Sequence, residues 1–229
     1  MDKDELYQTV LEGLAHYLED PFVADVGHAL SRFPRPRLAL SLNKNQLRSK
    51  RWLLRELRRV YPDPLGTVYV LGGWYGVLAA MLLADDKAEV DRVVSFDLDP
   101  DCEEVARALN HRHVRARRFF AVTRDMENLD YLTDRVPRSD DADAPLSVCA
   151  DLVVNTSCEH LDDFCGWYRG VPRGTLMVLQ SNDFFSCEEH VNCVPDLETF
   201  QRQAPMDPLL SASSLALKRY TRFMLIGRR

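Results

Sequence analysis

From Thr67 onward the chain alternates short apolar runs with helical stretches, and this alternation restricts the fold more than any other feature. Helical patterns over 76–84 and 101–110 separate the first three apolar runs, and the runs themselves cover 67–71, 92–99, 116–123, 149–155 and 174–181. Strands that alternate with helices form a mostly parallel sheet with helices on both faces. The sequence therefore predicts a doubly wound, Rossmann-like α/β fold.

The C-terminal pattern differs. Two apolar runs, 209–218 and 221–228, follow each other with almost nothing between them. A parallel crossover needs a dozen residues or more, so these runs must form an antiparallel hairpin. The polar, Asp-rich stretch around Ser139 to Asp143 is predicted to be a loop.

Three helices are expected before the first strand. Residues 4–32 have the spacing of two amphipathic helices, the second opened by Pro21, and residues 43–60 resume a helix that ends before Pro62. Pro34 and Pro36 break the chain between them. A chain of 229 residues suits one domain, with an N-terminal helical region over 1–64 and an α/β core over 65–229.

The net charge of -6 gives no general attraction to phosphate backbones, so we expect a small-molecule substrate rather than nucleic acid. Local groups of basic residues at 48–59 and 112–118 are interpreted as solvated faces. There is no signal-peptide pattern at the start and no apolar run of about 18 residues, which predicts a cytoplasmic protein without membrane contact. Association into a homodimer stays open.

Six cysteines in a chain of this length do not form a disulfide framework, and we expect reduced thiols. Cys187, His190 and Cys193 lie close together in the sequence, with Cys158 and His160 upstream. Soft metals bind such groups, but these spacings match no zinc module. The expectation is therefore that no metal is bound.

A glycine-rich turn follows the first strand, in the segment VYVLGGWYG at 68–76. In doubly wound sheets, ligands bind beyond the carboxyl ends of the strands, where strand order reverses. Glycines there let the backbone approach a ligand, although they could also serve helix packing alone.

An acidic residue, Asp97, ends the next strand 21 positions after Gly76. A carboxylate there can accept hydrogen bonds from both ribose hydroxyls of an adenosine cofactor. Asp99 precedes Pro100 and is expected to cap the following helix, although the two aspartates could exchange roles.

Two further groups follow later strands. After the third strand, Asp125 could accept from an adenine amino group while Met126 packs on the ring; a plain surface loop is the alternative. In 150–161 an apolar strand gives way to Asn155, Thr156, Ser157, Cys158, Glu159 and His160. So many polar side chains at a strand end indicate an active-site loop.

In this order and at these intervals, LGGWYG, FDLDP, RDM and VVNTSCEH resemble motifs I, post-I, II and IV of the class I S-adenosylmethionine-dependent methyltransferases. The resemblance covers Thr67 to Arg229, and the helices before it would form a lid and substrate region. It implies S-adenosyl-L-methionine as cofactor. The implied contacts are Gly72, Gly73, Tyr75 and Gly76 at the methionine moiety, Asp97 at the ribose, Asp125 and Met126 at adenine, and Asn155 near the sulfonium.

Two departures from motif I stand out. Val70 occupies the place of the acid that usually binds the methionine amine, and Trp74 replaces the usual second glycine. Trp74 or Tyr75 could lie against the sulfonium as a cation–π partner, or Trp74 could simply pack in the core.

The remaining candidates concern the acceptor. Histidine titrates near neutral pH, so His160 and His190 are candidate bases, and Asn155 joins them in the catalytic set. Ser181 and Asn182 end the fifth strand and suit a small polar acceptor. Gln46 and Lys50 lie within one turn of the helix predicted over residues 43–60, before the first strand. Lys50 could bind the cofactor carboxylate there or belong to a solvated face.

These features favour methyl transfer to an oxygen or nitrogen of a small molecule. An alternative keeps the cofactor but displaces methylthioadenosine, by intramolecular cyclisation or aminocarboxypropyl transfer. The antiparallel end argues against a nucleotide-sugar or NAD enzyme. A non-catalytic binding module would leave the 155–160 loop without a role.

Overall fold

The computed structural model describes residues 3–33, 36–129, 131, 135–138, 141–147 and 149–229. Its α-helices are α1 (Lys3–Leu18), α2 (Pro21–Arg32), α3 (Pro36–Ser41), α4 (Lys44–Val60), α5 (Val77–Leu83), α6 (Asp101–Leu109), α7 (His111–Arg115), α8 (Phe164–Gly170) and α9 (Leu197–Gln203). Its strands are β1 (Gly66–Leu71), β2 (Val90–Asp97), β3 (Phe119–Thr123), β4 (Arg135–Arg138), β5 (Asp141–Ser147), β6 (Leu152–Asn155), β7 (Leu176–Asn182), β8 (Leu209–Ala216) and β9 (Thr221–Arg228). Two short 3-10 helices, η1 (Met126–Asn128) and η2 (Cys158–His160), complete the elements.

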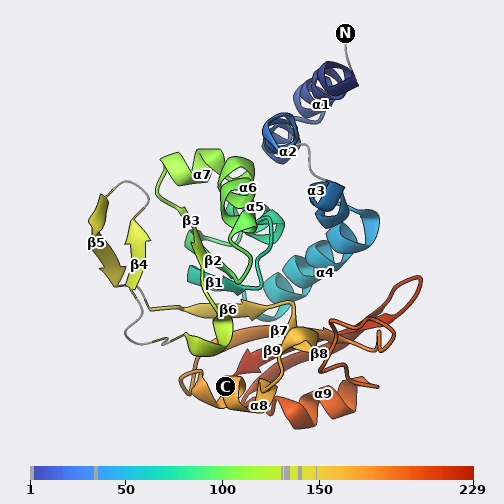
Figure 1. Cartoon of the computed structure of the whole chain (residues 1–229). Helices are drawn as coiled ribbons and strands as arrows, with labels where there is room; N and C mark the ends of the chain where they lie inside the picture. The colour runs from blue at the N-terminus through green and yellow to red at the C-terminus, as the bar shows by residue number, and fades with distance from the viewer. Residues whose placement is uncertain (1–2, 34–35, 130, 132–134, 139–140, 148) are drawn as a thin grey trace.

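Seven strands form one sheet in the order β3-β2-β1-β6-β7-β9-β8 (Figure 1). The first five pair in parallel, and β9 runs antiparallel to both β7 and β8. This confirms the predicted doubly wound sheet with a C-terminal antiparallel hairpin. The chain first builds outward from β1 to β3 and then returns to the other side of β1, so strand order reverses between β1 and β6.

Successive side chains of each strand enter different cores, because strand residues point alternately to opposite faces. Val68 and Val70 of β1 pack on one face with α4, α5 and α6. Tyr69 and Leu71 pack on the other face with α8 and α9. This two-sided burial explains why the parallel strands are apolar without interruption.

The N-terminal helices have local start signals. The Asp20 carboxylate accepts a hydrogen bond from the Phe22 amide at 2.9 Å, and Asn43 accepts from the first amides of α4. Ala29 of α2 and Leu38 of α3 join a third core with Tyr75 and helices α5 and α6. Figure 1 shows α1 projecting beyond α2, away from the sheet. Among the described residues, no helix has the length and apolar character needed to cross a membrane.

The structure corrects several element predictions. A fourth N-terminal helix, α3, begins at Pro36, and α7 displaces the start of the third strand from 116 to Phe119. The predicted loop at 139–143 is wrong for residues 141–143, which lie in β5; residues 139–140, like Pro34, fall outside the described residues. Helix α6 takes Pro100 rather than Asp99 as its N-cap, but the Asp99 carboxylate still accepts from the Asp101 amide at 2.9 Å.

Candidate functional site

A cavity of about 630 Å³ opens at the carboxyl ends of β1, β2, β3 and β6. It therefore lies where strand order reverses, which is where doubly wound folds bind ligands. Ten of the fourteen residues predicted from the sequence line it: Gln46, Lys50, Gly72, Gly73, Tyr75, Asp97, Asp125, Met126, His160 and His190. The other four, Gly76, Asn155, Ser181 and Asn182, are not part of the lining.

The turn from β1 into α5 has the backbone conformation that its glycines suggest. Gly72 has a φ of +60° and Gly76 a φ of +71°, both in the left-handed region. A Cβ at Gly76 would also approach Asn110 Nδ2 to 2.6 Å. Gly76 is thus required at the N-cap of α5 and for close packing there, while Gly72 and Gly73 line the cavity.

Trp74 occupies the same turn with a φ of 50°, an unfavourable value for a side chain that is not glycine. The left-handed conformation costs such a residue roughly 1–2 kcal/mol. Two contacts stabilise Trp74 in this conformation. Its backbone amide donates to Asp97 Oδ2 at 2.7 Å, and its indole stacks on the Tyr75 ring with the centroids 5.1 Å apart. Both residues line the cavity, but Trp74 is partly exposed and also packs against the third core, whereas Tyr75 is nearly fully buried.

Asp97 connects this turn to β2. Its Oδ1 accepts from the Asp99 amide at 3.1 Å while Oδ2 holds Trp74. Burial raises the pKa of this carboxyl, and hydrogen bonds from backbone amides oppose the rise. A carboxylate has about four acceptor positions, so Asp97 can still accept hydrogen bonds from a ligand beside those from the backbone.

Asp125 and Met126 close the same side of the cavity. The Asp125 carboxylate accepts from the Glu127 amide at 2.9 Å and from Asn128 Nδ2 at 2.6 Å, which fixes the start of η1. Met126 Sδ lies 3.7 Å from Asn155 Nδ2. Asn155 itself is fully buried, and its Oδ1 accepts from the Ser157 amide at 2.8 Å. Asn155 thus shapes the loop beneath the lining.

Lys50 reaches the cavity from α4. Its Nζ donates to Gln46 Oε1 at 2.8 Å. Burial, followed by the charge of Arg222, lowers the pKa of Lys50 from 10.5 to about 7. Both cations line the cavity, and the Arg222 Nε has no hydrogen-bond partner among the described residues. This part of the cavity is therefore suited to an anionic group.

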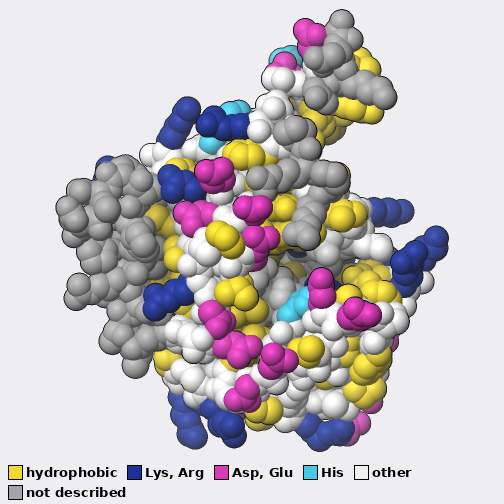
Figure 2. All heavy atoms as spheres, in the orientation of Figure 1, with side chains coloured by type: hydrophobic (Ala, Val, Ile, Leu, Met, Phe, Trp, Pro, Cys, Tyr) yellow, Lys and Arg dark blue, Asp and Glu magenta, His cyan; other side chains and the backbone are white. Residues whose placement is uncertain are grey.

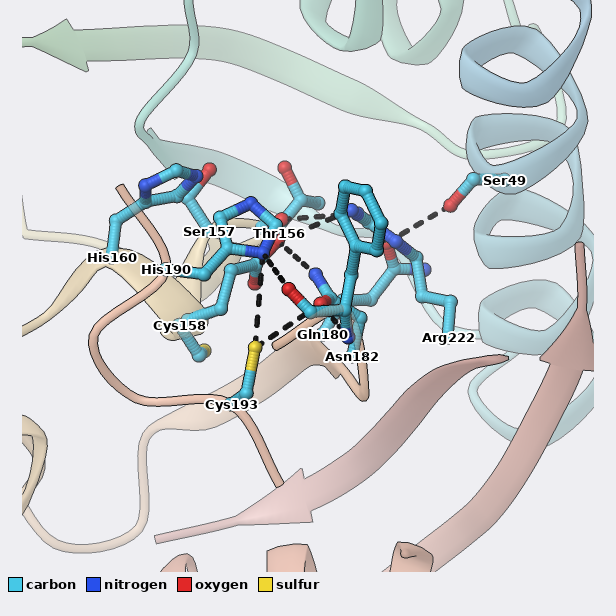
Figure 3. A network of polar contacts seen from close by, with 12 residues as sticks. Ser49, Thr156, Ser157, Cys158, His160, Gln180, Asn182, His190, Cys193 and Arg222 are labelled. Carbon is cyan, nitrogen blue, oxygen red and sulfur yellow. Dashed lines mark hydrogen bonds and ion pairs between the residues drawn. The ribbon is translucent and has the colours of Figure 1, made fainter. Parts of the chain in front are cut away.

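A buried polar network lies under the loop at 155–160 (Figure 3). Glu159, 2% exposed, accepts through Oε1 from Asn182 Nδ2 at 2.6 Å and from Arg222 Nη2 at 3.2 Å. Arg222 also donates to the Thr156 carbonyl oxygen at 3.1 Å. Asn182 is fully buried within this network, and Ser181 is fully buried beside it.

His160 and His190 stand together at the edge of this network (Figure 3). Their ring centroids lie 4.7 Å apart in an edge-to-face arrangement. His160 Nδ1 lies 2.9 Å from the Glu189 carbonyl oxygen, and His190 Nδ1 lies 3.2 Å from the Phe184 carbonyl oxygen. Burial lowers the pKa of His190.

The sequence analysis placed Glu159 in the predicted active-site loop without giving it a role, and it missed Arg222 altogether. Glu159 stood in the loop already singled out, but nothing in the sequence distinguished it from its neighbours. Arg222 belongs to β9, a strand read only as part of the C-terminal hairpin, and antiparallel pairing with β7 brings it to the cavity opposite Asn182.

The cavity lining carries more acidic than basic side chains: Asp97, Asp99, Asp125, Glu127, Glu159 and Glu189 against Lys50, Arg124 and Arg222. Figure 2 shows Asp and Glu side chains gathered around a histidine at the centre of the view, with most Lys and Arg toward the edges. Partial burial and the nearby Asp125, Asp162 and Asp163 raise the pKa of Glu127, which lines the cavity.

No family model and no curated protein matches the sequence. Solved structures do match the fold. N-methyltransferase NodS from Bradyrhizobium japonicum WM9 has a TM-score of 0.57 at 14% identity, covering 82% of this chain and 98% of that chain. A candidate sarcosine dimethylglycine methyltransferase from Galdieria sulphuraria has a TM-score of 0.57 at 11% identity, covering 80% and 86%. The [4+2]-cyclase SpnF has a TM-score of 0.57 at 10% identity, covering 80% and 82%. The chain therefore has the fold of the class I S-adenosylmethionine-dependent methyltransferases.

Proposed function

We propose that this protein transfers a methyl group from S-adenosylmethionine to an oxygen or nitrogen of a small polar molecule. The observation that carries the proposal is the convergence of Gly72, Asp97 and Met126, from three successive strand ends, with Lys50 of α4 on a single cavity. The cavity volume, about 630 Å³, is within the range of small-ligand sites.

The lining offers complementary chemistry to each part of that cofactor. Asp97 can accept from the ribose hydroxyls, and Met126 with the exposed Leu98 provides apolar surface for adenine. Lys50 and Arg222 both line the cavity and suit the carboxylate of the methionine moiety: an anion there would favour the charged form of Lys50 and could accept from Arg222 Nε, which has no hydrogen-bond partner among the described residues.

When bound, the cofactor supplies a methyl group already activated by its sulfonium. The protein then has to align the acceptor and remove its proton. We assign acceptor binding to the wall formed by His160 and His190. A carbonyl oxygen can only accept, so Nδ1 is the donor in the contacts of His160 with Glu189 and of His190 with Phe184, although His190 Nδ1 also lies 3.7 Å from Cys193 Sγ; with this tautomer, Nε2 has the lone pair that an acceptor proton needs.

The charge of the surface favours a small acceptor over nucleic acid. Protein surfaces that bind nucleic acid neutralise phosphates with Lys and Arg. Here the cavity lining has more acidic than basic side chains, Asp and Glu gather on the face shown in Figure 2, and the whole chain carries a net charge of -6. An acidic entrance also attracts a cationic cofactor.

Calorimetry with S-adenosylmethionine, S-adenosylhomocysteine and NAD tests the cofactor. We expect both sulfur nucleosides to bind and NAD not to bind. Asp97→Asn should weaken S-adenosylhomocysteine at least about tenfold, since hydrogen bonds to charged groups contribute about 1.5–3 kcal/mol. Asp91→Asn, an exposed carboxylate at the other end of the same strand, is the control and should bind like the parent. Equal affinity of Asp97→Asn and parent would contradict the assignment.

Mass spectrometry of the nucleoside product tests the reaction. The protein is incubated with the cofactor and a panel of small amines, hydroxy compounds and short RNAs. Methyl transfer releases S-adenosylhomocysteine and adds one methyl to a small acceptor. Release of methylthioadenosine would instead establish displacement of that group, and a methylated RNA would refute the substrate class.

A further inference from the structure

We propose that Glu159, His160 and His190 bind a divalent transition-metal ion on the wall of the cavity. One potential ligand atom from each of the three side chains lies within 4.8 Å of the others, and all three residues line the cavity. The sequence had placed His160 and His190 in a group with three cysteines without predicting a metal site, whereas the structure brings these two imidazoles together with the Glu159 carboxylate.

One oxygen of the Glu159 carboxylate has no hydrogen-bond partner among the described residues. Glu159 is 2% exposed, and its Oε1 accepts from both Asn182 and Arg222. Its Oε2 is buried and has no hydrogen-bond partner among the described residues. A buried carboxylate oxygen without a partner is costly, and a bound cation would satisfy it.

Hydrogen bonds also hold the ligands in orientations typical of metal sites. Each histidine presents Nδ1 to a backbone carbonyl, Glu189 for His160 and Phe184 for His190, and His190 Nδ1 also lies 3.7 Å from Cys193 Sγ; these contacts engage Nδ1 and leave Nε2 as the nitrogen that can coordinate. Metal-binding histidines usually donate their other ring N–H in this way, and metal-binding carboxylates are held by further hydrogen bonds. Asn182 and Arg222 supply the latter.

The ligand set indicates the class of ion. Imidazole suits zinc, copper, iron and nickel, whereas Mg²⁺ and Ca²⁺ prefer oxygen ligands alone. Bonds of about 2.0–2.2 Å place ligand atoms roughly 3–3.5 Å apart. The three side chains would therefore have to close by about an ångström around the ion, which the partly exposed imidazoles can do by rotation.

Three protein ligands leave coordination positions open toward the cavity, as in catalytic metal sites. An ion there would bind the acceptor heteroatom and lower its pKa. The histidines would then act on the acceptor through the ion rather than as bases. This role rests on the proposed methyl transfer, but metal binding itself does not.

The experiment measures metal binding directly, on the full chain stripped with a chelator. Calorimetry with Zn²⁺, Co²⁺, Mn²⁺ and Mg²⁺ is combined with the visible absorption of the Co²⁺ complex. We expect one equivalent of Zn²⁺ or Co²⁺ to bind, with Mg²⁺ much weaker. His160→Ala and His190→Ala should each weaken Co²⁺ binding at least about tenfold. His16→Ala, an exposed histidine of α1, is the matched control and should bind Co²⁺ like the parent.

Failure of the parent to bind any of the transition ions would overturn the proposal, as would unchanged Co²⁺ binding in both histidine variants. Circular dichroism of each variant establishes that a loss is not unfolding. Glu159→Gln should also weaken Co²⁺ binding, and unchanged Co²⁺ binding in a folded Glu159→Gln variant would contradict the proposed role of the carboxylate as a ligand. S-adenosylhomocysteine binding, measured separately in the stripped protein, shows whether the cofactor assignment fails independently of the metal site.

Discussion

Replacing Lys50 by methionine should remove a pH-dependent part of the protein's stability. The folded protein lowers the pKa of Lys50 from 10.5 to about 7. Between these two values the unfolded chain holds the proton and the folded chain does not. The unfolded state therefore binds more protons, and the free energy of unfolding of the parent rises with pH through this window.

The size of the effect follows from the two pKa values. At pH 7 the folded protein is about half protonated at Lys50, and at pH 9 it is almost fully neutral, while the unfolded chain stays protonated at both. Integrating the difference gives the parent about 2 kcal/mol more stability from Lys50 at pH 9 than at pH 7. Methionine has a similar length and no charge, so the variant should lack this increment and be the more stable protein at pH 7.

Urea unfolding at pH 7, 8 and 9 measures the difference between parent and Lys50→Met. The difference should shift by about 2 kcal/mol in favour of the parent across this range. Lys44→Met, at an exposed position of the same helix, is the control, and its difference from the parent should stay flat. A flat difference for Lys50→Met as well would show that Lys50 is not desolvated in the folded protein, and would refute the reasoning.

Three further predictions concern the buried groups of the site. Gly76→Ala should lower the unfolding free energy by about 1–3 kcal/mol in urea unfolding, because its Cβ meets Asn110 at a positive φ. Arg222→Met should cost about 3–5 kcal/mol in the same assay, since it leaves the buried Glu159 carboxylate without its ion pair, and the double variant with Glu159→Gln should recover part of the loss. Trp74→Gly should relieve backbone strain yet weaken S-adenosylhomocysteine binding by calorimetry; tighter binding would show that the indole obstructs the ligand.

Local sequence patterns predicted the sheet and most helices because burial on both faces leaves continuous apolar runs, as in β1 and β7. The hairpin of β4 and β5 was missed because its residues, rich in Asp and Pro, carry no such run. Much of the cavity lining was predictable from the residues at the carboxyl ends of the predicted strands, because parallel strands bring these ends to the same edge of the sheet. Burial depth was not predictable: Ser181 and Asn182 end β7, yet Arg222 of the neighbouring strand covers that position.

The indole of Trp74 has a practical consequence for chemical probes. It takes up room at a turn where methyltransferases of this fold usually carry glycine, and it does so on the cavity lining. If the cavity binds the cofactor as proposed, a nucleoside analogue with an aromatic extension on this side could stack on this indole, a partner that a glycine at this position would not provide. Such a compound offers a route to selective inhibition that depends on a single side chain.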